Sequence, residues 1–110
     1  MSETIQIKLR KQGELYECEI DGDKYAFGVW AWGTKNKTTS ECTRVLPTGI
    51  QQLDIGEFNL RMLLQTLKKA PFKIDRATIE SHPNPRLIDL LIQISSKLNL
   101  LGTVEIENLS

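Results

Sequence analysis

The sequence predicts an α+β fold, in which an N-terminal three-stranded antiparallel meander is followed by two to three helices packed on the sheet. Three observations support this prediction. Apolar and polar residues alternate in the first third of the chain, turn-forming residues separate the alternating runs, and apolar residues recur at helical spacing in the second half. We expect the sheet to occupy about residues 4–32 and the helical part about residues 54–101.

Size and composition predict a single domain over residues 1–110. The hydrophobic fraction is 40% and the charged fraction 25%, close to the average of globular proteins. Lys and Arg together number 14 and so do Asp and Glu, which disfavours nucleic-acid binding through a net basic face. The N-terminus has no secretory signal, and polar side chains interrupt residues 87–101, so we expect a cytoplasmic protein with no membrane partner.

The first two strands are expected to form a hairpin. Its apolar positions alternate with polar ones: Ile5, Ile7 and Leu9, then Tyr16, Cys18 and Ile20. A two-residue loop at Gln12 and Gly13 sets Lys11 opposite Glu14. That register pairs the apolar positions with one another on one face: Leu9 with Tyr16, Ile7 with Cys18, Ile5 with Ile20. On the other face it pairs Lys8 with Glu17, so opposite charges meet across the strands.

A third strand is expected over residues 24–32. The turn at Asp21, Gly22 and Asp23 that precedes it is of the kind that favours primed hairpin turns. One face of this strand carries Tyr25, Phe27, Val29 and Ala31, and the other carries Ala26, Gly28, Trp30 and Trp32. A strand that is apolar on both faces is either covered on both sides or contacts a partner. The tryptophans therefore lie either under a helix of the second half or in an exposed patch.

Two segments follow the third strand. Residues 34–46 are interpreted as a short helix that starts at Thr34 or Thr38, or as a loop, and the Pro-Thr-Gly sequence at 47–49 ends it in either case. Asp54 and Glu57 have the spacing of a capping box, and we expect their helix to run to about Lys69.

The last third of the chain is expected to be helical as well. Pro71 stops the preceding helix, and Asp75 caps a short helical turn through residue 80. Asn84 and Pro85 are typical of an N-cap and first helical residue, so a final helix should run to about Asn99. Residues 103–106 could add an edge strand.

Catalytic and metal-binding patterns are not apparent. The one histidine, His82, lies between structural breakers, and a general base needs a partner within hydrogen-bond reach. Cys18 and Cys42 are unclustered and are interpreted as ordinary thiols. No phosphate-binding glycine loop occurs, and turn chemistry accounts for Asp21 and Asp23. We therefore expect no catalytic residue, no metal and no cofactor.

The order of features from Tyr25 onward carries a family resemblance. An aromatic Phe-Gly-Val-Trp-Ala-Trp-Gly strand leads through a Lys/Thr-rich segment to Cys-Thr-Arg, then to a helix ending Lys-Lys-Ala-Pro-Phe, to Ile-Glu-Ser-His-Pro and to a Leu-rich last helix. Residues 25–101 thus resemble small accessory proteins of tailed-phage and phage-derived particles, of the tail assembly chaperone or baseplate accessory type. The resemblance implies a non-enzymatic assembly or structural factor whose partner is another protein of the particle. Its carried-over positions are Trp30, Trp32, Pro71 and Phe72 with the helix at residues 87–99.

The leading hypothesis is therefore a protein-binding factor, with self-association left open. The predicted partner-binding residues are Trp30, Trp32, Leu15 and Phe72. The alternative hypothesis is a small regulatory or ligand-binding domain, in which the sheet and the helices enclose a pocket lined by Tyr16, Phe27 and Trp30.

Overall fold

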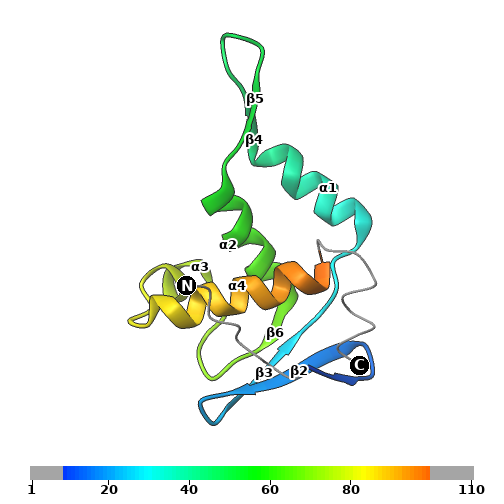
Figure 1. Ribbon diagram of the computed structural model, residues 1–110, viewed down its shortest axis with the longest axis vertical. Helices are drawn as coiled ribbons and strands as arrows, with labels where there is room; N and C mark the ends of the chain where they lie inside the picture. The colour runs from blue at the N-terminus through cyan, green and yellow to red at the C-terminus, as the bar shows by residue number, and fades with distance from the viewer. Residues whose placement is uncertain (1–8, 100–110) are drawn as a thin grey trace, which may run out of the picture.

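The computed structural model describes residues 9–99 and has the α+β architecture that the sequence predicts (Figure 1). Its strands are β1 (Arg10–Gln12), β2 (Leu15–Ile20), β3 (Asp23–Phe27), β4 (Thr43–Val45), β5 (Gln51–Leu53) and β6 (Leu67–Lys69), and its helices are α1 (Trp32–Glu41), α2 (Ile55–Thr66), α3 (Arg76–Glu80) and α4 (Pro85–Asn99). The sheet order is β1-β2-β3-β6, and β4 pairs only with β5. The expected pairings of Ile5, Ile7 and Lys8 and the expected strand at residues 103–106 lie outside the described residues.

The first hairpin forms, but the predicted register is wrong. Lys11 pairs with Tyr16 and Arg10 with Glu17, so the loop is Gly13 and Glu14 and not Gln12 and Gly13. Gly13 has a φ of 64°, a conformation that glycine adopts far more readily than glutamine. Moving the loop by one residue slides the pairing by two, which keeps the same side chains on the buried face.

The second hairpin has the turn that its sequence predicts. Asp21 and Gly22 both have positive φ, 51° and 84°, as a type I′ turn requires. Cys18 then lies opposite Tyr25 and Tyr16 opposite Phe27. These four side chains share the face that packs on the helices.

The third strand ends at Phe27, five residues earlier than predicted, because the next backbone groups bond elsewhere. The Gly28 N–H donates to the Thr66 carbonyl at 2.7 Å, and the Trp30 N–H donates to the Asn99 side chain at 2.6 Å. Helix α1 begins at Trp32. Val29, expected on the inner face, is 56% exposed.

Residues 34–46, interpreted above as helix or loop, contain both a helix and a strand. Helix α1 begins before Thr34, with Ala31 at the N-cap and no side-chain capping bond. Strand β4 follows it and turns back into β5 through residues 46–50. The Gly49 N–H donates to the Leu46 carbonyl at 2.8 Å and Gly49 has a φ of 87°, as in a type I turn followed by a left-handed glycine.

Helix α2 begins as predicted and ends three residues early. The Asp54 carboxylate accepts the Glu57 N–H at 3.1 Å, which is the N-cap half of the predicted capping box. The predicted continuation to Lys69 is wrong, because Leu67–Lys69 forms strand β6 beside β3. A strand pairing has overridden the helix preference of Leu and Lys here.

The last two helices confirm their predicted starts. The Asp75 carboxylate accepts the Thr78 N–H at 2.8 Å at the start of α3, and Asn84 accepts the Leu87 N–H at 3.3 Å at the start of α4. Helices α2 and α4 lie on one face of the sheet (Figure 1). The main core between them contains Cys18, Ile20, Tyr25, Phe27, Leu63, Leu67, Leu91, Ile94 and Leu98.

Candidate functional site

A short exposed apolar segment lies between β3 and the first turn of α1. Trp32 is 80% exposed and Val29 is 56% exposed, and Ala31 is exposed as well. Helix α1 does not need the indole for packing, since its one buried residue is Thr38. Tryptophan is enriched where proteins bind one another, so we treat this segment as the candidate contact surface.

Trp30 lies two residues earlier and is buried. Its indole packs edge-on against Phe58 of α2, with ring centroids 5.6 Å apart, in a second apolar cluster that also holds Cys42 and Met62. The two tryptophans would share one face if the strand continued through them. The strand ends before Trp30, so the structure places one indole in the core and the other in solvent.

A chain of polar contacts, part-buried at Asn99 and buried at Ser95 and Thr66, fixes the backbone beside Trp30. Asn99 accepts the Trp30 N–H through its side-chain oxygen, and its amide nitrogen donates to the Ser95 carbonyl at 2.8 Å. The Ser95 hydroxyl contacts the Thr66 hydroxyl at 2.5 Å, and Thr66 donates to the Met62 carbonyl. Helices α2 and α4 thus hold the start of the exposed segment in place.

The remaining predicted binding residues lie in other surroundings. Leu15 is half-buried in β2 opposite Gln12. Phe72 follows β6 and packs on the main core, with its ring centroid 6.3 Å from that of Tyr25 and 5.0 Å from that of His82. The structure therefore does not gather Trp30, Trp32, Leu15 and Phe72 into one surface, and Trp32 is the member most exposed to solvent.

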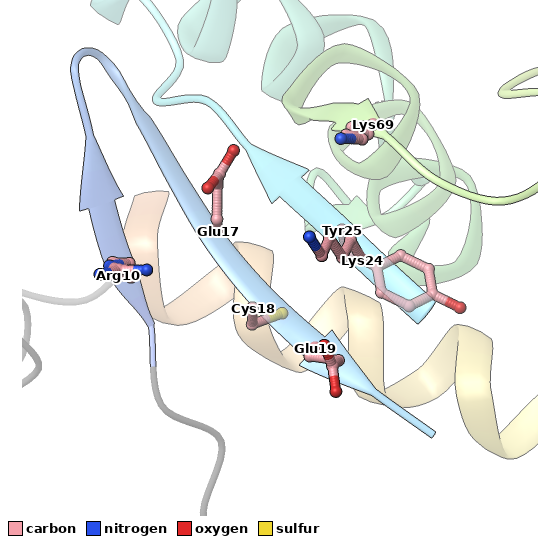
Figure 2. Close-up of a pocket in the computed structure, with 7 residues that line it drawn as sticks. All are labelled: Arg10, Glu17, Cys18, Glu19, Lys24, Tyr25 and Lys69. Carbon is pink, nitrogen blue, oxygen red and sulfur yellow. The ribbon is translucent and has the colours of Figure 1, made fainter. Parts of the chain in front are cut away.

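A hollow lies on the sheet, lined mainly by charged side chains of the face turned away from the main core, together with the core residues Cys18 and Tyr25. Figure 2 shows its lining side chains on β1, β2, β3 and β6, with α4 behind the strands. Its charges oppose one another across the strands, since Arg10 faces Glu17 and Glu19 faces Lys24. Its volume of about 240 Å³ is below the ~300–1,000 Å³ of most small-ligand sites. We interpret it as a gap between paired surface charges.

The alternative hypothesis predicts a pocket between the sheet and the helices, but two of its three predicted lining residues are themselves packed in the core. Phe27 is fully buried in the main core, and Trp30 belongs to the second cluster. Tyr16 is half-buried at the margin of the main core. The hollow described above is lined mainly by the opposite face of the sheet.

The two cysteines and the histidine are packed or hydrogen-bonded within the fold. Burial raises the pKa of the Cys18 thiol to about 11 and also raises the pKa of Cys42, so both thiols stay protonated at neutral pH. The Nδ1 atom of His82 accepts the Asn84 N–H at 3.0 Å, and its ring packs edge-on against the ring of Phe72. Among residues 9–99, no group of His, Cys, Asp and Glu side chains has the arrangement of a metal site.

An ion-pair network joins the three helices α1, α2 and α3. Glu57 accepts two bonds from Arg76, at 2.6 and 3.0 Å, and one from Arg61 at 2.7 Å. Arg61 also bonds Glu41 at 3.0 Å. The hydrogen bonds from Arg76 and then Arg61 lower the pKa of Glu57 from 4.5 to about 2. Glu80 lies 4.0 Å from Arg76 at the edge of the same network. Since every carboxylate in the network contacts a guanidinium, we interpret the network as structural.

Comparison of the chain with protein-family models, curated proteins and solved structures gives no match. No helix within residues 9–99 has the length and apolar character needed to span a membrane. The exposed segment around Trp32 is thus the candidate site that the geometry itself supports.

Sequence reasoning missed two features of this region. The role of Asn99 depends on a contact 69 residues away in the chain, and nothing near Asn99 in the sequence indicates it. The β4–β5 hairpin did have an indicator, because Pro47 and Gly49 occupy favoured positions of a type I turn between two short runs that contain Val45 and Ile50. The sequence prediction treats these residues only as the end of a helix or loop.

Proposed function

We propose that this protein is a non-enzymatic binding factor that contacts another protein through the surface centred on Trp32. The observation that carries the proposal is the 80% exposure of its indole. A packed tryptophan buries about 150–250 Å², so covering the exposed part contributes about 3 to 5 kcal/mol of transfer free energy at ~25 cal/mol/Å². Tryptophan is enriched among the residues that dominate binding energies.

The partner class that we propose follows from the resemblance of residues 25–101 to tail accessory proteins. The partner is then a tail or baseplate component of a phage-like particle, met in the cytoplasm during assembly. Trp32 is one of the positions that the resemblance carries over, and it is the exposed one of the pair with Trp30. The products of the genes beside its own are the first candidates to test.

Fluorescence quenching tests whether the surface is available. Iodide is a water-soluble quencher, so it should quench Trp32 and leave the buried Trp30 emitting at shorter wavelength. A Trp32→Phe variant should then show only the unquenched component. If iodide reaches neither indole in the free protein, the surface is covered and the proposal fails.

A binding titration tests the partner. Each candidate protein is titrated with the wild-type chain, with Trp32→Ser and with Lys37→Ser, a matched exposed substitution in the same helix. A central aromatic contact is worth ~2 kcal/mol or more, which is a roughly thirtyfold loss of affinity for Trp32→Ser. Lys37→Ser should bind like the wild type. Equal affinities of the two variants would rule out Trp32 as the contact, whatever partner is found.

A further inference from the structure

The ribbon formed by β4 and β5 presents two open strand edges. It projects from the end of the molecule beyond α1 and α2 (Figure 1) and pairs only with itself. The Leu46 N–H donates to the Ile50 carbonyl at 2.8 Å, and the Asp54 N–H donates to the Cys42 carbonyl at 2.8 Å. These bonds show that, within the ribbon, the backbone N–H and C=O groups of even-numbered residues point toward the other strand. The backbone groups of odd-numbered residues, Thr43, Val45, Gln51 and Leu53, therefore point outward.

The edge of β5 differs in charge from the other open edges within residues 9–99. Lysine or arginine protects strand edges from pairing with another chain. Such residues are present on the other three edge strands: Arg10 and Lys11 on β1, Arg44 on β4, and Lys68 and Lys69 on β6. Strand β5 consists of Gln51, Gln52 and Leu53, with no charge, proline or glycine. Val45 and Ile50 beside it are 67% and 62% exposed.

We propose that β5 is a self-association edge, whose occupant is the β5 strand of a second copy of this chain. The outward groups of each copy belong to Gln51 and Leu53. One antiparallel register lets every one of these outward N–H and C=O groups form a hydrogen bond. It sets Gln51 opposite Leu53 of the second copy, and it forms four backbone hydrogen bonds between the two copies. Gln52 then faces Gln52 of the second copy across a two-fold axis. The product is a four-stranded sheet in the order β4-β5-β5-β4. This edge is distinct from the Trp32 surface.

Charge and exposure favour a second copy as the occupant. Two β5 strands meet without like charges, whereas pairing through β4 brings two copies of Arg44 together. Antiparallel pairing places the two bodies at opposite ends of the joint sheet. Continuing the register sets Ile50, at the tip of each ribbon, opposite Asp54 of the second copy. Ile50 is 62% exposed in the single chain, and the pairing brings it against the backbone of the second copy.

Disulfide trapping tests the register. Residues that face each other in a non-hydrogen-bonded antiparallel pair have Cα atoms about 4.5 Å apart, within the range that a disulfide spans. Gln52→Cys should therefore form a covalent dimer on mild oxidation. The matched variant Gln51→Cys, which faces Leu53 of the second copy, should not. Native Cys18 and Cys42 are buried and should stay reduced.

Sedimentation velocity of the full chain, in a series up to about 1 mM, tests the association itself, since so small an interface belongs to the transient class. The wild type should shift toward dimer with concentration. In the Gln52→Glu variant the new carboxylate lies opposite Arg44 of its own ribbon, so the ribbon should be preserved. In a dimer, however, the two carboxylates would meet at the two-fold axis, so this variant should stay monomeric at pH 7. If the wild type stays monomeric over the whole concentration series, the proposal is overturned. This holds even if β5 is then found to pair with a different protein. Equal cross-linking of Gln51→Cys and Gln52→Cys overturns it too.

Discussion

Replacing Asn99 by alanine should destabilise the fold by about 2 kcal/mol, although Asn99 is the last residue of α4. Its side-chain oxygen accepts the Trp30 N–H at 2.6 Å, and its other bonds go to the Ser95 carbonyl at 2.8 Å and, more weakly, to the Gly28 carbonyl at 3.4 Å. Without that oxygen the Trp30 N–H has lost its acceptor, and an unpaired buried donor costs ~1–3 kcal/mol.

Urea unfolding followed by circular dichroism measures the effect. A loss of ~2 kcal/mol moves the midpoint by roughly 1 M urea and lowers Tm by about 10 °C for a domain of this size. Gln93→Ala is the matched control, because Gln93 is exposed on the same helix and its loss should stay within ~0.5 kcal/mol. Amide hydrogen exchange gives the direct readout, since the Trp30 amide should lose protection in Asn99→Ala. The reasoning is refuted if both variants are equally stable or if that amide stays protected.

Three further predictions concern charge, thiols and backbone conformation. Because the pKa of Glu57 is lowered from 4.5 to about 2, the ionised Glu57 stabilises the folded state fully above about pH 5, and this stabilisation is lost as the pH falls toward 2. Glu57→Gln should therefore be less stable than the wild type at pH 7. The urea midpoint of this variant should also change less between pH 5 and pH 2 than that of the wild type. Cys18 and Cys42 are buried with raised pKa values, so iodoacetamide at pH 8 should modify them only after urea unfolding; fast labelling of the folded protein would contradict their placement. Gly22 has a φ of 84°, so Gly22→Ala should cost about 1 kcal/mol in thermal unfolding, whereas Gly56→Ala, in a helical turn with no close contact, should stabilise by about 0.5 kcal/mol; the same sign for both would refute the argument.

Features that depend on a few neighbouring residues could be predicted from the sequence. Asp54, Asp75 and Asn84 each accept a backbone N–H three residues ahead, and this geometry is local to a helix start. The Asp21 and Gly22 turn is local in the same way, because positive φ at both positions selects these residue types. The first loop could be placed only to within one residue, since both candidate registers bury the same side chains.

Features that depend on distant residues could not be predicted. Leu67 and the two lysines after it favour a helix by propensity, and only their position beside Phe27 of β3 makes them a strand. Phe27 ends its strand because Thr66 and Asn99 satisfy the next backbone donors, and those partners are 38 and 69 residues away in the chain. The different surroundings of Trp30 and Trp32 follow from that strand end.

The two proposed contact surfaces lie at opposite ends of α1. Trp32 is its first residue, and its last residue, Glu41, leads within two residues to β4 of the ribbon. Ten helical residues span about 15 Å, so a partner held at Trp32 leaves the β5 edge open. Substitutions at sites so far apart act additively. Trp32→Ser should therefore leave the concentration-dependent association unchanged, and Gln52→Glu should leave partner affinity per chain unchanged. A loss of both activities in either variant would mean that the two surfaces form one interface, and the helix between them would then be part of it.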